Sequence, residues 1–168
     1  MNENVFDVLI IGSGPAGLTA AIYTQRAALK TLVLAGNMPG GQLTVTTIVE
    51  NYPGFAKGIG GTGLMMAMQE QVKNLGVEIR NGNVKQIQNE SNPPKSPFDK
   101  GDFSVLLEDN ETIKTKSIIV ATGARARWLG LPNERELMGK GVSGCATCDG
   151  MFFKDKIVAV VGGGGGGL

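Results

Sequence analysis

Residues 12–17, Gly12-Ser13-Gly14-Pro15-Ala16-Gly17, decide the fold of this chain. They follow the apolar run Val8-Leu9-Ile10-Ile11 and open the segment 18–23, which gives a strand, a glycine turn and a helix. In a dinucleotide-binding unit the first glycine permits the tight turn, the second lets the backbone approach a pyrophosphate, and the third allows close helix–strand packing. The helix N-terminus then faces the anion. This frame predicts a nucleotide site rather than a plain structural turn.

Composition narrows the classes of function. The chain has 168 residues and a net charge of +1 without a long basic run, so nucleic acid is not a predicted partner. No apolar run approaches the ~20 residues of a membrane span, and the acidic start, residues 1–4, does not resemble a secretory signal. We therefore expect a cytoplasmic protein. The chain contains no histidine, which excludes His-based metal sites and His-assisted nucleophiles supplied by this chain.

The two cysteines, Cys145 and Cys148, stand three positions apart. In a cytosolic protein this spacing favours redox chemistry, because structural disulfides are rare in that compartment. Inert thiols and a zinc site are the alternatives. Zinc would need two more good ligands, and the sequence shows no second cluster, so we expect no metal.

The end of the second predicted strand, residues 31–35, departs from the usual dinucleotide pattern. That position commonly carries an acid for the ribose hydroxyls, whereas here the strand runs into Ala35-Gly36-Asn37. No Asp or Glu occurs from Val8 to Val49, so the acid is absent from this segment. No Arg follows the strand either, which speaks against binding of an NADP 2′-phosphate here.

The rest of the chain predicts an α/β fold with a parallel sheet, helices and an antiparallel ribbon. The first helix is expected from Pro15 to about Leu29, and Thr62 is expected to cap a second one that runs to about Leu75. The apolar face of that second helix, which includes Met65 and Met68, is expected to pack in the core. Further strands are predicted at 77–79, 84–87, 103–107, 112–113 and 117–121.

Two segments carry expectations of their own. The long non-periodic stretch 36–61 is either a surface loop or a ligand-binding loop, and its length favours the second reading. The apolar run 156–161 leads into glycines, as the opening motif does, and predicts a buried strand that begins a second dinucleotide-binding domain. We therefore expect domains at 1–123 and 124–168. The proline-rich stretch 89–101 is assigned no function.

Five motifs together resemble the low-molecular-weight thioredoxin reductases of bacteria, archaea and plants. They occur in that family's order and at similar spacing: Gly12-Ser-Gly-Pro-Ala-Gly17, Gly40-Gly-Gln-Leu43, Glu50-Asn-Tyr-Pro-Gly54, Ala121-Thr-Gly123 and Cys145-Ala-Thr-Cys148-Asp149-Gly150. The resemblance implies a flavoprotein that passes electrons from NADPH to FAD, then to the cysteine pair and then to the disulfide of thioredoxin. It also implies a homodimer. Relative to the family pattern, we expect an FAD domain lacking its C-terminal segment and only the start of the NADPH domain.

The resemblance also implies roles for particular residues. The FAD pyrophosphate is expected over the first glycine loop, the flavin and its ribityl chain near the second loop, and the adenine side near two later segments. These residues are Gly12, Ser13, Gly14, Pro15 and Ala16, then Gly41, Gln42 and Asn51, and finally Val84, Ala121, Thr122 and Gly123.

At the cysteine pair, the resemblance makes Cys148 the sulfur that meets the flavin and Cys145 the one that exchanges with thioredoxin. Cysteines of such units commonly attack as thiolates. Asp149 becomes the acid/base, although the residues alone equally suit an acid favoured by a helix N-terminus. Two other functions stay open: a flavin-binding fragment without activity, and a related reductase with another electron donor or dithiol acceptor.

Overall fold

A computed structural model describes residues 5–89 and 103–162, with the side chain of Thr147 excepted. The predicted proline-rich stretch and the glycine tail therefore lie largely outside the described residues. The chain divides into two compact units, Met1–Gly123 and Ala124–Leu168.

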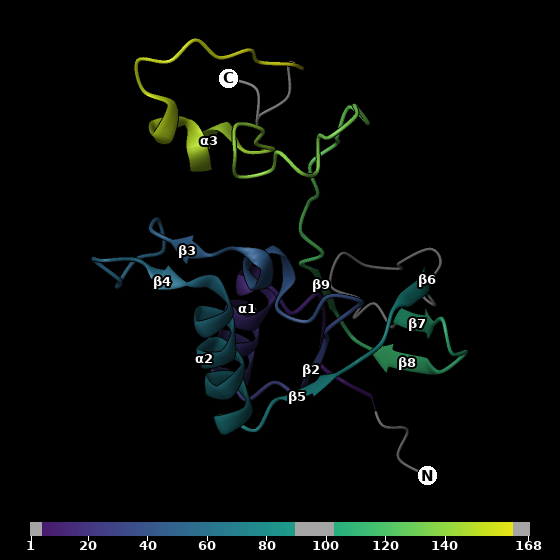
Figure 1. The fold of residues 1–168 in the computed structure, drawn as a ribbon. Coiled ribbons are helices and arrows are strands. Elements are labelled where there is room, and N and C mark those ends of the chain that lie inside the picture. The colour runs from purple at the N-terminus through teal and green to yellow at the C-terminus, as the bar shows by residue number, and fades with distance from the viewer. Residues whose placement is uncertain (1–4, 90–102, 163–168) are drawn as a thin grey trace. The chain divides into compact units, whose positions relative to one another are not determined.

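A four-stranded parallel sheet is the centre of the first unit (Figure 1). Its strands are β1 (Val8–Ile11), β2 (Thr31–Leu34), β5 (Glu78–Arg80) and β9 (Ile118–Val120), in the order β5-β2-β1-β9. β1 pairs with β2 and β9, so the strand that leads into the glycine motif has neighbours on both sides. This arrangement explains its continuous apolar sequence. The predicted α/β fold with a parallel sheet is confirmed.

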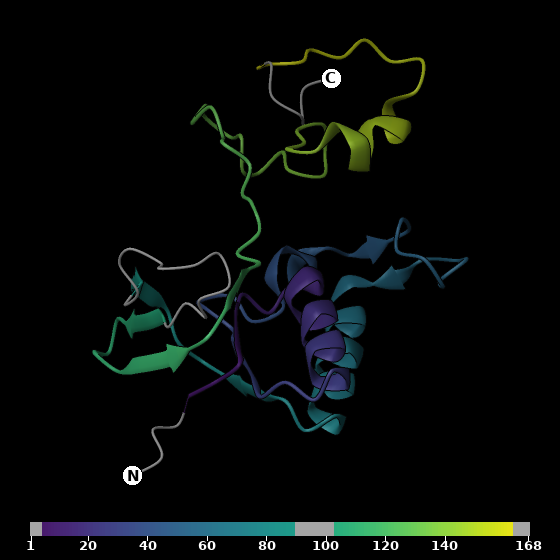
Figure 2. The ribbon, with the colours of Figure 1, turned by 180° about the vertical axis from the view of Figure 1, so that it is seen from behind.

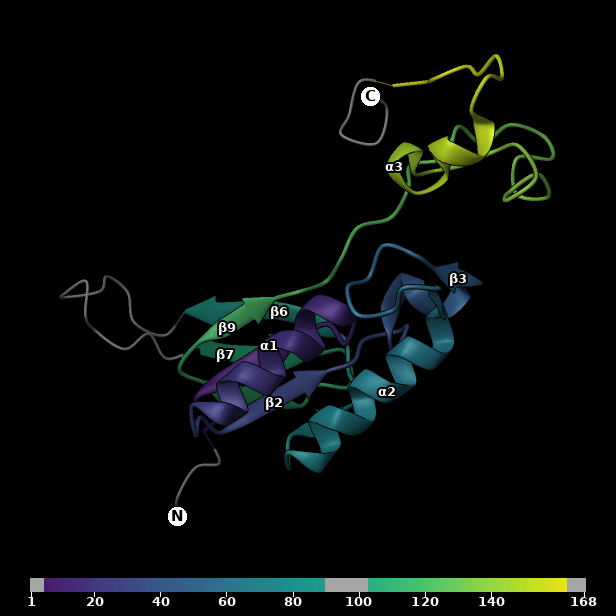
Figure 3. The same ribbon diagram turned by 90° about the vertical axis from the view of Figure 1, so that its left-hand side faces the viewer.

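Two helices, α1 (Pro15–Arg26) and α2 (Gly61–Asn74), pack against each other and against one face of this sheet (Figure 3). Alternate residues of β1 face them, because side chains of a strand point to opposite faces in turn. Val8 and Ile10 join Leu18 of α1 in this core, together with the buried α2 residues Leu64, Met65, Met68 and Val72. The methionine face is core, as predicted.

The opposite face of the sheet is covered by a three-stranded antiparallel sheet (Figure 1). It consists of β6 (Val84–Asn89), β7 (Phe103–Leu107) and β8 (Thr112–Thr115), in chain order. Leu9, Leu32 and Leu34 pack there against residues of β7 and β8. The predicted antiparallel ribbon is therefore confirmed. It makes the unit three layers deep.

Residues 35–60 link β2 to α2. The 3-10 helix η1 (Gly41–Val45) follows the glycine bend, and the two-residue strands β3 (Ile48–Val49) and β4 (Ile59–Gly60) pair antiparallel (Figure 2). Much of the predicted loop 36–61 is thus ordered as a short helix and a hairpin.

Two details of the helices correct the sequence predictions. α1 ends at Arg26 rather than near Leu29, because Ala28 takes a positive φ of 56°. α2 has Gly60 at its N-cap and no capping side chain, so the prediction that Thr62 caps it was wrong. The Thr62 hydroxyl instead donates to the carbonyl of Thr44 at 3.0 Å, which ties η1 to the helix.

The second unit has little regular structure. Among residues 124–162 the elements are the short helix α3 (Ala146–Asp149) and the 3-10 helix η2 (Gly150–Phe153). The prediction of a buried strand at 156–161 was wrong: these residues are exposed and unpaired, and Val158 keeps 58% of its surface accessible. A strand buried on both faces needs neighbouring strands, and residues 124–162 form none. None of the helices among the described residues is long and apolar enough to cross a membrane.

Candidate functional site

The glycine motif lies at the carboxyl edge of β1, where the backbone turns into α1. Gly12 has a φ of +113°, and a Cβ there would lie 2.2 Å from the carbonyl oxygen of Ala121. A Cβ on Gly17 would lie 1.9 Å from the carbonyl oxygen of Gly12. The first and third glycines are therefore required by close backbone approach within the chain itself.

Gly14 differs from these two glycines. A Cβ built at this position would meet no heavy atom within 4 Å, so the second glycine faces open space. Gly14 is also the N-cap of α1, which starts with Pro15 and has no acidic residue in its first turn. The first N–H groups of a helix lack intrahelical acceptors and favour an anion. The glycine loop and the N-terminus of α1 thus form a cradle that is open beside Gly14. Backbone N–H groups in this arrangement fit a dinucleotide pyrophosphate.

Ser13 lies in the middle of the motif, yet its side chain points into the protein. It is 2% exposed, and its hydroxyl donates to the carbonyl of Ala35 at 3.3 Å. The same hydroxyl accepts the backbone N–H of Gly40 at 3.0 Å. The Ser13 side chain therefore joins the glycine loop to the end of β2 and to the second glycine bend.

Three predicted segments meet at this edge of the sheet. Ala121 contacts Gly12 directly, and its own N–H donates to the carbonyl of Ile11 at 2.8 Å. Gly41 lies beside the cradle, since a Cβ on it would be 3.5 Å from the Cα of Gly14. The structure therefore brings together the first loop, the second loop and the end of β9, although they are far apart in sequence.

The other predicted contacts are more dispersed. Thr122 and Gly123 follow Ala121 and are exposed. Gln42 is exposed in η1, and Asn51 is exposed in the loop between β3 and β4. Val84 starts β6 and packs, half-buried, against the core between the two sheets.

The cysteine pair lies in the second unit. Cys145 and Cys148 form a disulfide with a Cα–Cα distance of 5.3 Å. Cys145 is the N-cap of α3, and its sulfur accepts the N–H of Cys148 at 3.2 Å. That donor would stabilise negative charge on Cys145 once the disulfide is reduced. Cys148 is exposed, while Cys145 is half-buried.

Asp149 is connected to the disulfide through Ser143. The Ser143 hydroxyl lies 2.5 Å from a carboxylate oxygen of Asp149 and accepts the N–H of Cys145 at 3.0 Å. Sequence reasoning missed Ser143, although a hydroxyl two residues before a C-x-x-C unit was a usable signal. The described residues hold no group of three or more His, Cys, Asp or Glu side chains that could bind a metal ion.

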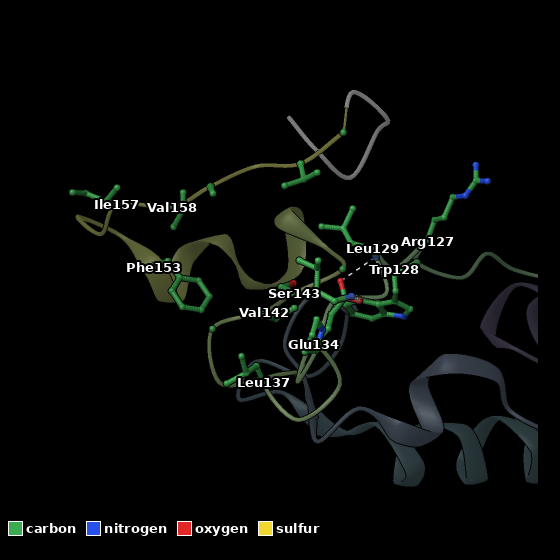
Figure 4. Close-up of a pocket in the computed structure, with 18 residues that line it drawn as sticks. Arg127, Trp128, Leu129, Glu134, Leu137, Val142, Ser143, Phe153, Ile157 and Val158 are labelled. Atoms are coloured by element: carbon green, nitrogen blue, oxygen red, sulfur yellow. Dashed lines mark hydrogen bonds between the residues drawn. The ribbon is translucent and has the colours of Figure 1, made fainter.

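A pocket of about 740 Å³ also lies in the second unit, and Ser143 forms part of its lining (Figure 4). Its lining comes from residues 126–144 and 153–162 and does not include either cysteine. Glu134 orders one wall, because its carboxylate accepts the N–H groups of Leu129 and Gly130 at 3.0 and 2.7 Å. Most of the other lining side chains are apolar, among them Trp128 and Ile157.

Residues 6–168 match the family described as pyridine nucleotide-disulphide oxidoreductase. The chain belongs to this family. It is 52% identical over 157 residues to the thioredoxin reductase of Rickettsia felis, covering 94% of this chain and 48% of that protein. It is 48% identical over 163 residues to the thioredoxin reductase of Mycolicibacterium smegmatis, covering 97% of this chain and 49% of that protein.

A solved structure agrees. The crystal structure of thioredoxin reductase from Streptococcus pyogenes superposes with a TM-score of 0.77 at 42% identity, over 90% of this chain and 46% of that one. These oxidoreductases confirm the resemblance to thioredoxin reductases that the motifs indicated. The chain spans about half the length of the curated relatives it matches.

Proposed function

We propose that this chain provides the flavin-binding and disulfide parts of an NADPH-dependent thioredoxin reductase. In this proposal electrons pass from NADPH through FAD and the Cys145–Cys148 pair to the disulfide of thioredoxin. One observation carries it: an open glycine cradle and a C-x-x-C disulfide occur in one chain of an oxidoreductase family. A cytoplasmic location and a homodimer belong to the same proposal.

The residues at the sheet edge fit FAD. Gly14 leaves the approach to the α1 N-terminus open, and the Gly12, Pro15 and Ala16 backbone completes the loop around it. Gly41, Gln42 and Asn51 would hold the flavin side, and Val84, Ala121, Thr122 and Gly123 the rest of the dinucleotide. The buried Ser13 side chain would contribute by fixing the position of the glycine loop. Bound FAD would supply the hydride-accepting chemistry that links NADPH to the cysteine pair and that side chains lack.

The cysteine pair would carry out the exchange with thioredoxin. In the reduced chain the Cys145 thiolate attacks the thioredoxin disulfide, forming a mixed disulfide and releasing one thioredoxin thiolate. The Cys148 thiolate then attacks Cys145, which re-forms the Cys145–Cys148 disulfide and releases the second thiolate. Asp149, hydrogen-bonded to Ser143, would hold or supply the proton that each released sulfur takes up.

Two measurements test this proposal. Flavin fluorescence during titration of the chain with FAD should show saturable binding, and an absence of binding would overturn the flavin part. For the exchange part, a single-cysteine thioredoxin carrying a thionitrobenzoate mixed disulfide is offered to two variants. Cys148→Ser should release thionitrobenzoate and form the mixed disulfide, whereas Cys145→Ser should react at least about tenfold more slowly. Equal rates, or the reverse order, would contradict the assignment of the attacking sulfur.

A further inference from the structure

The carboxyl end of β2 is the place where a dinucleotide fold usually holds the adenosine ribose with an acid. This chain has no Asp or Glu between Val8 and Val49. The strand instead runs into Gly36, with a φ of +68°, and Asn37. A carboxylate acceptor for the ribose hydroxyls would therefore have to come from another segment, if this edge binds a dinucleotide.

Polar side chains from three distant segments converge on that place. The side-chain amide of Asn83, between β5 and β6, donates to the side-chain oxygen of Asn37. It also donates to the carboxylate of Glu108, directly after β7, at 2.9 Å. The side-chain oxygen of Asn83 lies 3.8 Å from where a Cβ on Gly36 would stand, so the cluster is seated against the end of β2.

The backbone fixes Glu108 in this position. Its N–H donates to the carbonyl of Asn83 at 2.9 Å, which makes a second link between the same two residues. Leu34, which ends β2, and Leu107, which precedes Glu108, are both fully buried in the core between the sheets. Because Glu108 directly follows the packed strand β7, the antiparallel sheet holds the Glu108 carboxylate at the end of β2.

We propose that Glu108, oriented by Asn83, replaces the acid missing from β2 and accepts a hydrogen bond from the 2′-hydroxyl of the adenosine ribose. The inference rests on the proposed function, since it needs a dinucleotide in the glycine cradle. A carboxylate is an acceptor only, so it suits the hydroxyl donor and repels a phosphate at the same position. Asn83 is a positioning residue, because it holds the Glu108 carboxylate beside Asn37.

Glu111 provides a matched control in the same turn. Its carboxylate is committed to Arg80 at 2.7 Å, and Arg80 also pairs with Glu78 at 2.9 Å. Hydrogen bonding to Glu78, helped by the charge of Glu111, raises the pKa of Arg80. Glu111→Gln therefore removes the same charge from the same turn as Glu108→Gln without touching the cluster.

The experiment measures flavin fluorescence as the chain binds FAD and FAD whose adenosine ribose lacks the 2′-hydroxyl. The unaltered chain should bind the deoxy analogue roughly ten- to a hundredfold more weakly, as expected for a hydrogen bond to a charged group. Glu108→Gln, whose amide oxygen is only a neutral acceptor, should weaken FAD binding and reduce the preference between the two ligands to below about tenfold. Glu111→Gln should bind both as the unaltered chain does.

Each outcome decides a separate question. If the unaltered chain does not bind FAD, the proposed function fails and this inference fails with it. If FAD binds but Glu108→Gln matches Glu111→Gln, or keeps the full preference for FAD over the deoxy analogue, the ribose contact is elsewhere and only this inference is overturned. Circular dichroism of both variants during thermal unfolding separates a lost contact from a lost fold.

Discussion

The Ser13 hydroxyl accepts the backbone N–H of Gly40, with 3.0 Å between Oγ and N, in the buried interior of the first unit. Ser13 belongs to the first glycine loop and Gly40 opens the second, so one hydroxyl fixes the spacing of two loops that lie 27 residues apart. Any ligand held between these loops depends on this bond for the width of its site.

Ser13→Ala should destabilise the first unit by about 1–3 kcal/mol, because the buried Gly40 N–H loses its acceptor. Denaturant unfolding followed by circular dichroism measures the change. Thr19→Ala, which removes an exposed hydroxyl from α1, is the control and should change stability by no more than about 0.5 kcal/mol. An equal effect of both substitutions would contradict the role given to Ser13.

Gly12→Ala and Gly14→Ala should separate folding from binding. Gly12→Ala forces a Cβ to 2.2 Å from the Ala121 carbonyl at a positive φ, and should cost about 3 kcal/mol of stability. Gly14→Ala meets open space at an ordinary φ of −71°, and should cost at most about 1 kcal/mol, as expected for alanine at an N-cap.

FAD titration completes this comparison. The methyl group of Gly14→Ala would occupy the approach to the helix N-terminus, so FAD affinity should fall roughly tenfold or more while the protein stays folded. A folded Gly14→Ala variant with unchanged FAD affinity would show that the cradle does not hold the pyrophosphate.

Ser143→Ala should expose the backbone amide of Cys145 to solvent exchange. The hydroxyl accepts that N–H at 3.0 Å, and the net loss of one hydrogen bond corresponds to roughly three- to tenfold faster exchange. Amide hydrogen exchange followed by mass spectrometry measures it. Ser143→Thr, which keeps the hydroxyl, should restore slow exchange, and failure of that rescue would argue against the hydroxyl as the cause.

The two units should differ in resistance to protease. None of the described side chains from 124 to 162 is buried, whereas residues 5–123 contain two buried clusters. Brief digestion with trypsin should therefore cut first at the exposed Arg125 and Arg127 and leave a stable piece that ends near there. Simultaneous loss of both units would show that the second unit is as well packed as the first.

Local patterns sufficed to predict much of the first unit. The apolar run before Gly12 indicated a buried parallel strand, and Met65 and Met68 were placed in the core by helical spacing. These predictions held because strand and helix periodicity are set by nearest neighbours along the chain. The same reasoning gave the glycine loop its place at the start of α1.

Other features depend on contacts between residues that are far apart in the sequence, and local patterns do not reveal such contacts. Thr62 was a plausible cap, but its hydroxyl reaches Thr44, and only the folded loop brings that carbonyl close. The apolar run 156–161 lacks strands to pair with among the described residues of its unit. Its apolar sequence alone therefore led to the wrong prediction of a buried strand. The inward turn of Ser13 likewise depends on Ala35 and Gly40, which are neighbours only in space.

The contact between Gly12 and Ala121 has a consequence for biosynthesis. The glycine loop that forms the cradle is synthesised before its wall and the outer partner of β1, which come from residues 118–121. During translation the glycine loop therefore stays without its wall until β9, about a hundred residues later, has been made. Strand pairings over such sequence separations form slowly. Under the proposed function, flavin capture by the nascent polypeptide would consequently be a late event that depends on the emergence of β9.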